Sequence, residues 1–153
     1  VCERLGIDLQ VMEGASCTGA GVLQEKNQRL GDALNARTFA MAENSGLPLL
    51  TICSTCQGVM SQANERLKGD DDYLSDINGE LAEEGLEYKG SADPRHLLWV
   101  IIEDVGLDKL KSLVVRPISG IRVATFYGSP LYTSEAADDL VQCNRGRRRI
   151  VYK

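Results

Sequence analysis

The stretch Leu49-Leu50-Thr51-Ile52-Cys53-Ser54-Thr55-Cys56-Gln57-Gly58-Val59-Met60 carries an apolar run through a Cys-x-x-Cys motif directly into helix-forming sequence. It predicts a buried strand that ends at Cys53 and a helix whose first turn carries Cys56. Both thiols then lie at a helix N-terminus, where unpaired N–H groups and the positive end of the helix dipole favour thiolate. Thiolate is the form that binds metal or attacks disulfides. The stretch therefore predicts a chemical site.

The composition fits one domain of ordinary globular type. The chain has 153 residues, of which 25% are charged and 43% hydrophobic, and its net charge of -5 argues against nonspecific binding to nucleic acid. The longest apolar runs, near residues 47–52 and 97–102, are far shorter than the roughly 20 residues that span a bilayer. No secretory signal opens the sequence, so we expect a cytoplasmic protein.

The cysteines fit a reducing compartment, where thiols more often bind metal or carry out redox chemistry than cross-link a fold. There are five of them, Cys2, Cys17, Cys53, Cys56 and Cys143. Cys17 lies in the glycine-rich stretch 14–21, just beyond a strand predicted at 7–12. Glycines there let the backbone turn sharply and approach a bound group. We expect Cys2 and Cys143 to be incidental.

Predicted helices and strands alternate along the rest of the chain. Residues 1–5 have the pattern of the last turn of a helix that begins upstream, ended by Gly6. Residues 22–45 predict one amphipathic helix, ended by Gly46 and Pro48. Strands are predicted at 49–53, 121–127 and 150–152, and loops at 85–94 and 116–120. Helices are predicted from the Cys-x-x-Cys motif to about residue 68 and at 73–84, 107–113 and 134–143. A further helix is capped by Asp93, starts at Pro94 and buries residues 97–102.

This alternation predicts an α/β fold, with a mostly parallel sheet of three to four strands and helices on both faces. Ligands of such sheets bind outside the carboxyl ends of the strands. The turns at Cys17, at Cys53 to Cys56 and at Gly128-Ser129 all follow predicted strands. We therefore expect Cys17, Cys53 and Cys56 to meet at one edge of the sheet.

The order of three motifs resembles a known family. Ser16-Cys17-Thr18-Gly19, a helix, Cys53-Ser54-Thr55-Cys56 and a helix starting Arg95-His96-Leu97-Leu98 resemble the cysteine-rich CCG domain over about residues 6–127. That domain occurs in a subunit of heterodisulfide reductase and in related iron-sulfur subunits of succinate dehydrogenase-like, glycolate oxidase and lactate-utilisation enzymes.

The resemblance implies an electron-transfer module. Cys17, Cys53 and Cys56 would supply thiolates to a four-iron four-sulfur cluster, and no residue would be catalytic. The module would relay electrons between other oxidoreductase subunits, with flavin or iron-sulfur centres, and a disulfide or quinone acceptor. Those subunits would also bring it to the membrane periphery, and a homodimer is a further arrangement to consider.

The sequence also departs from the family pattern. The family's first strand and its cysteine would lie before Val1, and Cys17-Thr18-Gly19 is one thiolate short of Cys-Cys-Gly. Ser129 stands where a second copy would have its cysteine. We therefore expect residues 1–120 to be a CCG-like domain lacking its first strand and residues 121–153 to begin a truncated second copy. Strand 121–127 could fill the vacant position in the sheet and bring Ser129 beside Cys17, since an unpaired sheet edge is unfavourable.

Two alternatives to electron transfer remain open. One is a degenerate interaction module that is metal-free or binds zinc through the same three cysteines. The other is a thiol-disulfide oxidoreductase that uses Cys53 and Cys56 as a redox pair. A hydrolase based on Cys56 and His96 lacks an orienting Asn or Asp. For His96 a structural hydrogen bond is favoured over ligation, Trp99 is expected in the core, and the arginines at 145–149 are expected to form a solvated tail.

Overall fold

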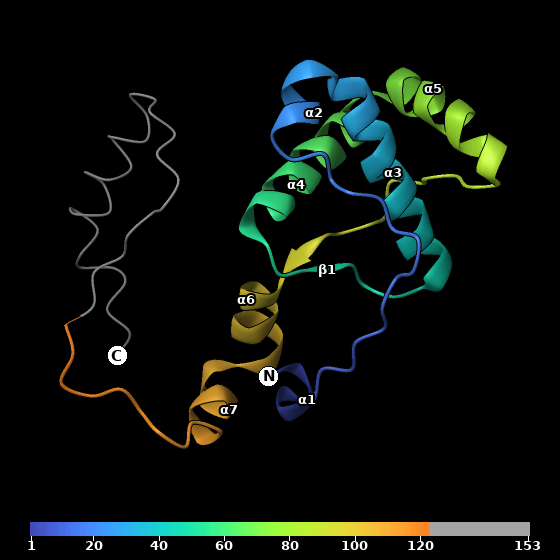
Figure 1. Ribbon diagram of the computed structural model, residues 1–153. Helices are drawn as coiled ribbons and strands as arrows, with labels where there is room; N and C mark the ends of the chain where they lie inside the picture. Colours follow the sequence, from blue (N-terminus) through green and yellow to red (C-terminus); the bar gives the residue numbers. More distant parts are fainter. Residues whose placement is uncertain (123–153) are drawn as a thin grey trace. The chain divides into compact units, whose positions relative to one another are not determined.

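The computed structural model describes residues 1–122. The chain divides into two units, Val1–Val115 and Arg116–Lys153. The first unit contains, in order, α1 (Cys2–Leu5), α2 (Val22–Lys26), α3 (Gln28–Ser45), β1 (Leu50–Thr51), α4 (Ser54–Gly69), α5 (Asp71–Leu81), the 3-10 turn η1 (Ala82–Glu84), β2 (Arg95–His96), α6 (Leu97–Val100), the π-helical turn η2 (Ile101–Val105) and α7 (Leu107–Ser112) (Figure 1). Residues 116–122 form neither helix nor strand.

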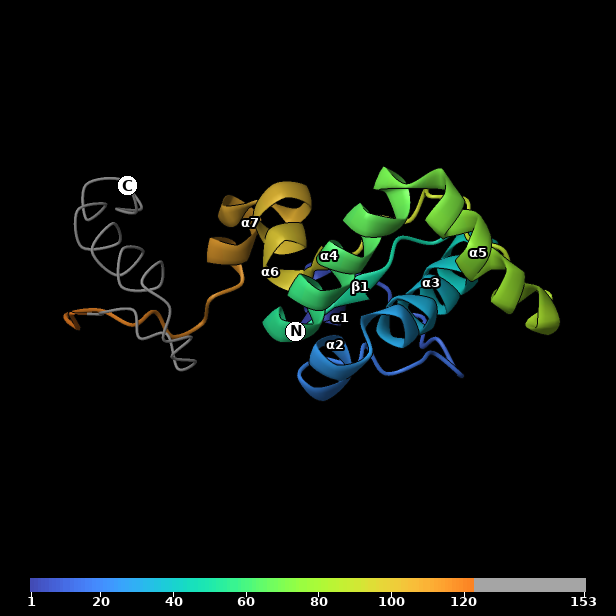
Figure 2. The same cartoon turned by 90° about the horizontal axis from the view of Figure 1, so that it is seen from above.

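The core lies between α3, α4 and α5, each of which contacts the other two (Figures 1 and 2). Small residues on the facing surfaces let the helix backbones approach closely, while a few large side chains fill the centre. The rings of Phe39 and Tyr88 pack with centroids 5.2 Å apart. The buried cluster comprises Ala33, Ala36, Phe39, Ala40, Met60, Ala63, Leu67, Ile77, Leu81, Tyr88 and Ala92.

The helix predicted over residues 22–45 is two helices, and Asn27 separates them. Its backbone leaves the helical region, with φ -151° and ψ 77°, and its side-chain oxygen accepts a hydrogen bond from the N–H of Leu30 at 3.1 Å. Asparagine is a strong N-cap and a weak interior helix residue, so capping α3 is favoured over continuing α2. The predicted end is confirmed, because Gly46 closes α3 in the left-handed conformation at φ 67°.

The sheet is parallel but small. Leu50 pairs with Arg95 and Thr51 with His96, so β1 and β2 point the same way. The strands are parallel as predicted, and the α/β class is not contradicted, but the described part of the chain is mostly helical and contains one two-stranded sheet rather than three or four strands. Strand β1 is half-buried rather than buried and ends before Ile52, which is 77% exposed.

The strand predicted at residues 7–12 is wrong. The segment has neither helix nor strand, and Leu9 and Val11 are 53% and 81% exposed. Alternation of apolar and polar residues makes a strand only where a neighbouring strand supplies hydrogen bonds and a core face. Within residues 1–122 no strand pairs with this segment.

The helix predicted from Pro94 is also wrong at its start. The N–H of Arg95 donates instead to the carbonyl of Leu49 at 2.9 Å, and pairing with β1 delays the helix to Leu97. Burial differs too: Ile101 is buried, but Leu98 and Trp99 are 60% and 57% exposed, so Trp99 is not a core residue.

The loop at residues 85–94 is confirmed, and Glu43 of α3 holds it. The carboxylate of Glu43 accepts hydrogen bonds from the N–H groups of Lys89, Ser91 and Ala92 and from the hydroxyl of Ser91, at 2.6 to 3.2 Å. Burial raises the pKa of Glu43, but these hydrogen bonds outweigh it and lower the pKa below its ordinary value. The loop is thereby fixed where it leads into β2.

The remaining helix predictions agree with the structure within a few residues. A helical turn ends at Gly6 in the left-handed conformation, α4 extends to Gly69, α5 with η1 covers all of 73–84, and α7 lies at the predicted position. In the described part of the chain, no helix combines the length and apolarity needed to cross a membrane. The predictions for residues 123–153 lie outside the described residues. They concern most of the strand at 121–127 and its proposed sheet position, Ser129, Cys143, the arginine tail, the tail helix and the last strand.

Candidate cysteine site at the start of helix α4

Cys53 and Cys56 occupy the junction between β1 and α4, as the motif predicts. Cys53 is the N-cap residue of α4, with extended φ and ψ of -107° and 120°, and its carbonyl accepts the first helical hydrogen bond from Gln57 at 2.9 Å. Cys56 lies in the first turn of the helix. Cys53 is exposed and Cys56 is half-buried, so the site presents one accessible thiol and one shielded thiol.

The helix start lowers the pKa of the Cys53 thiol below its ordinary value. The backbone N–H of Cys56 contributes most, followed by the Cys56 thiol and the backbone N–H of Thr55, against a smaller opposing effect of desolvation. Cys53 makes no side-chain cap hydrogen bond, so these groups act on the sulfur through their positive charge density rather than through one well-aligned bond. The site therefore favours a thiolate at Cys53.

The side chain of Gln57 holds the cysteine turn against neighbouring segments, a role that the sequence analysis did not predict. Its amide oxygen accepts a hydrogen bond from the hydroxyl of Thr51 at 2.6 Å, and its amide nitrogen donates to the carbonyl of Pro94 at 2.5 Å and to Ser61 at 3.2 Å. The side chain thus joins β1, the segment before β2 and α4. A glutamine after a Cys-x-x-Cys motif carries no pattern of its own, so only the fold could identify it.

His96 has the structural hydrogen-bonding role that the sequence favoured. Its Nδ1 accepts the N–H of Leu98 at 3.2 Å and caps α6, while its Nε2 lies 3.5 Å from the hydroxyl oxygen of Ser54. The residue is 8% exposed. Because β1 and β2 are parallel, His96 and the cysteine turn leave the sheet at the same edge.

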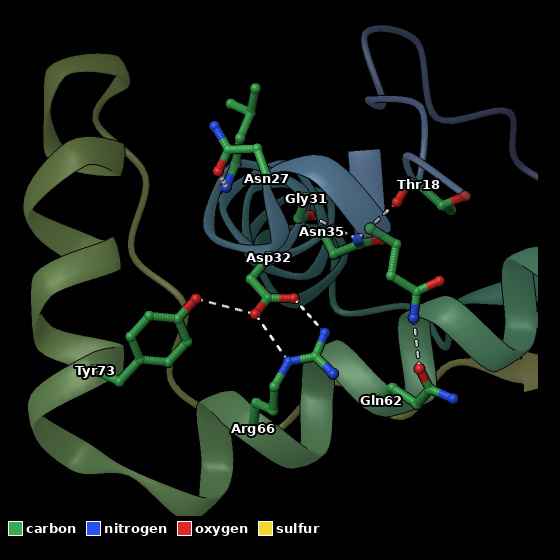
Figure 3. A network of polar contacts seen from close by, with 10 residues as sticks. Thr18, Asn27, Gly31, Asp32, Asn35, Gln62, Arg66 and Tyr73 are labelled. Atoms are coloured by element: carbon green, nitrogen blue, oxygen red, sulfur yellow. Dashed lines mark hydrogen bonds and ion pairs between the residues drawn. The ribbon is translucent and has the colours of Figure 1, made fainter. Parts of the chain in front are cut away.

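Cys17 lies on a loop that α3 fastens in three places. Arg37 donates to the carbonyl of Gly14 at 2.6 Å, the N–H of Ser16 donates to Thr38 at 3.3 Å, and Asn35 donates to the carbonyl of Thr18 at 3.0 Å. Figure 3 shows the last contact, between the side chain of Asn35 on α3 and the carbonyl of Thr18. The side chain of Cys17 is exposed. The loop is thus anchored on both sides of an accessible thiol.

Two buried polar atoms, on Thr18 of this loop and on Asn35 of α3, have no hydrogen-bond partner within the described residues. They are the hydroxyl of Thr18 and the side-chain oxygen of Asn35, whose nitrogen is already engaged with Thr18 and Gly31. Gly19, which follows, has φ 74°, and a Cβ there would come within 2.9 Å of Leu23 Cβ. The backbone at this position therefore requires glycine.

The three predicted ligands do not form a closed metal site. Among residues 1–122, no three His, Cys, Asp or Glu side chains lie close enough to one another to hold a metal ion. The structure brings Cys53 and Cys56 together on one helical turn and places Cys17 on a separate loop. Cys2 lies in α1 and is half-buried. The chemistry of the donors fits a thiophilic centre, since an exposed thiol with a lowered pKa is paired with a second thiol.

Comparison with known proteins places this arrangement in context. Residues 1–61 match the family model CCG, described as a cysteine-rich domain. The chain is 40% identical over 128 residues to the 8-methylmenaquinol:fumarate reductase membrane anchor subunit of Wolinella succinogenes, covering 84% of this chain and 44% of that protein. It is 35% identical over 130 residues to a subunit of the ferredoxin/F(420)H(2)-dependent CoB-CoM heterodisulfide reductase of Methanosarcina acetivorans, covering 84% and 43%.

A third relative is a heterodisulfide reductase subunit-like protein of Archaeoglobus profundus, 34% identical over 141 residues, covering 91% of this chain and 47% of that protein. The chain therefore spans less than half the length of these curated relatives.

Proposed function

We propose, from the match of residues 1–61 to the CCG cysteine-rich domain model, that the chain is an iron-sulfur electron-transfer module of a heterodisulfide reductase-like or succinate dehydrogenase-like oxidoreductase. The observation that carries the proposal is the Cys53–Cys56 turn, where a parallel strand ends at a helix start that favours thiolate. The relatives are named as subunits of reductases, which supports a module that works beside other redox subunits.

We assign Cys17, Cys53 and Cys56 as the thiolates that would hold a four-iron four-sulfur cluster. Such a cluster supplies one-electron transfer when bound. The chain's own contribution is positioning and electrostatics. The N–H groups of Thr55 and Cys56 stabilise negative charge on sulfur, and Gln57 holds the turn against the sheet. The anchored loop at residues 14–21 would bring Cys17 to the same centre.

The acceptor and the partners follow from this role as proposals. The module would pass electrons between a flavin or iron-sulfur subunit and a disulfide or quinone. It would act in the cytoplasm, and a membrane-bound partner subunit would hold it at the membrane surface. The name of the Methanosarcina relative, a heterodisulfide reductase subunit, supports a disulfide acceptor, whereas the name of the Wolinella relative supports a quinone-type partner that acts as its reduced quinol donor.

The test is the iron and acid-labile sulfide content of the chain purified without oxygen, together with its visible charge-transfer absorbance. We expect iron in the wild-type protein and its loss in C17S, C53S and C56S, because each variant removes one thiolate. Cys2→Ser is the matched control and should keep its iron, since Cys2 lies in α1 and outside the assigned set. Wild-type protein without iron, or with zinc in its place, would overturn the proposal in favour of the interaction module.

A thiol-disulfide oxidoreductase is the second candidate, and one observation favours it. Cys53 is exposed with a lowered pKa, while Cys56 is half-buried one turn along, as an attacking and a resolving thiol would be. This function predicts a reversible Cys53–Cys56 disulfide and reduction of a model disulfide by the iron-free chain. In that case C17S would retain full activity, which separates the two functions.

A further inference from the structure

We infer that His96 is a positioning residue of the cysteine turn, acting through the hydroxyl of Ser54 on the first turn of α4, which carries Cys53 and Cys56. The inference rests on the proposed function for its purpose, since there the two thiols are ligands whose orientation matters. Its evidence is the contact between Nε2 of His96 and Oγ of Ser54, 3.5 Å apart at the shared edge of β1 and β2.

The direction of this hydrogen bond follows from the other ring nitrogen. Nδ1 of His96 accepts the N–H of Leu98 at 3.2 Å, so it carries no proton. The neutral imidazole then has its proton on Nε2, which must donate, and the Ser54 oxygen must accept. The hydroxyl proton of Ser54 is therefore not used in this contact and can be donated to another acceptor. Within the described residues that hydroxyl makes no other hydrogen bond.

Burial of His96 holds its ring in place at this contact. His96 is 8% exposed and lines a shallow depression of about 280 Å³ together with Gln57, Trp99 and Glu103. Ser54 itself is exposed, so the restraint comes from the ring, which its buried surroundings hold in place beside the Ser54 hydroxyl. Gln57 braces the same helical turn through Thr51 and Pro94. His96 and Gln57 therefore hold the first turn of α4 at two adjacent points.

The free hydroxyl proton gives the arrangement a chemical use. Ser54 directly follows Cys53 in the sequence, and its donor is oriented by His96 rather than consumed by it. A donor in this place can serve an anionic sulfur bound at the turn, whether a cysteine thiolate or a cluster sulfide. Hydrogen bonds to cluster sulfurs are among the groups that set reduction potential.

The decisive test is amide hydrogen exchange of Gln57, whose N–H donates the first helical hydrogen bond of α4 to the Cys53 carbonyl, in the full chain without a cluster. His96→Asn should keep α6 capped, because asparagine is a strong N-cap, while it removes the atom that reaches Ser54. We expect exchange in the α4 first turn to accelerate by about tenfold in H96N and in S54A, roughly the effect of one lost hydrogen bond. Ser54→Thr retains the hydroxyl and should restore the wild-type rate.

Trp99 provides the control for α6. It is the only tryptophan of the chain and lies three residues beyond His96, so unchanged fluorescence in H96N reports an intact α6. If H96N does not fold, S54A alone decides, since it leaves the histidine cap in place. Unchanged exchange in S54A, or acceleration in S54T equal to that in S54A, would overturn the inference.

A second readout separates this inference from the proposed function. If the chain binds a cluster, S54A and H96N should shift its reduction potential to a more negative value, and S54T should not. If the chain binds no cluster, the proposed function fails, yet the exchange experiment still decides whether His96 positions the turn. If His96 served only to cap α6, S54A would change neither the amide exchange rate nor the reduction potential.

Discussion

The guanidinium of Arg66 on α4 donates two hydrogen bonds to the carboxylate of Asp32 on α3, at 2.9 Å and 2.6 Å, and the carboxylate is almost completely buried (Figure 3). Tyr73 of α5 donates a third hydrogen bond to the same carboxylate at 3.0 Å. Three helices thus meet at one buried charge. The contact fixes α4, whose other end presents the cysteine turn.

Removing Arg66 should destabilise the protein strongly. Arg66→Ala leaves the Asp32 carboxylate buried without its cation, and loss of one partner of a buried pair costs about 3 kcal/mol or more. Arg29→Ala is the matched control, because Arg29 pairs with Asp76 and Glu80 at the surface and such pairs contribute about 1 kcal/mol or less. Urea unfolding measures both free energies, and equal losses would contradict the assignment.

Alkaline pH should destabilise the protein through Tyr73. Burial, followed by its hydrogen bond to Asp32 and the charge of Asp32, raises the pKa of Tyr73 from 10.0 to about 12. A folded-state pKa above the unfolded one means that the unfolded chain loses its proton first. Stability is therefore complete below pH 10 and falls as the pH rises toward 12.

Tyr73→Phe should reduce that alkaline decline while lowering stability near neutral pH by about 1 kcal/mol, the value of one hydrogen bond. Part of the decline should persist, because burial also raises the pKa of Tyr88. Thermal unfolding from pH 8 to pH 11 tests this expectation, and parallel curves for Y73F and wild type would contradict it.

Cys53 should be more reactive than an unstructured cysteine. The N–H of Cys56, the thiol of Cys56 and the N–H of Thr55 lower its pKa, so more thiolate is present at neutral pH. Iodoacetamide labelling of the reduced, metal-free chain, followed by peptide mass spectrometry, should give a faster rate for Cys53 than for a model cysteine peptide. C56S should slow the reaction only in part, since the backbone N–H remains. A rate equal to that of the peptide would refute the electrostatic argument.

Asn27→Ala should lower the free energy of unfolding by about 1 kcal/mol, because it removes the side-chain acceptor for the N–H of Leu30 at the start of α3. Asn27→Asp keeps an acceptor and should be close to wild type. If alanine were neutral, residues 22–45 would gain as much from one continuous helix as from two. Urea titration of the three proteins distinguishes these outcomes.

Helices and their ends could be predicted because their causes are local. Gly6 and Gly46 close helices in the left-handed conformation, and the apolar periodicity of α4 and α5 is contained within their own residues. The break at Asn27 was missed although its signal was present, since an asparagine inside a helical pattern competes as a cap. Strands were predicted less accurately than helices. Residues 7–12 alternate correctly but lack a partner in the described chain, whereas Arg95 and His96 pair because Leu50 and Thr51 lie beside them.

The sequence by itself determined the chemistry of the candidate site: two thiols in a Cys-x-x-Cys motif at a strand-to-helix junction, with Cys17 in a glycine-rich loop. Only the tertiary structure decided what surrounds them. The contact of His96 with Ser54 and the bonds of Gln57 to Thr51 and Pro94 depend on β1 and β2 running parallel, and these strands are far apart in the chain. Spacing along a sequence fixes which groups share one helical turn, but hydrogen bonds between distant segments form only after the chain has paid the entropy of bringing them together.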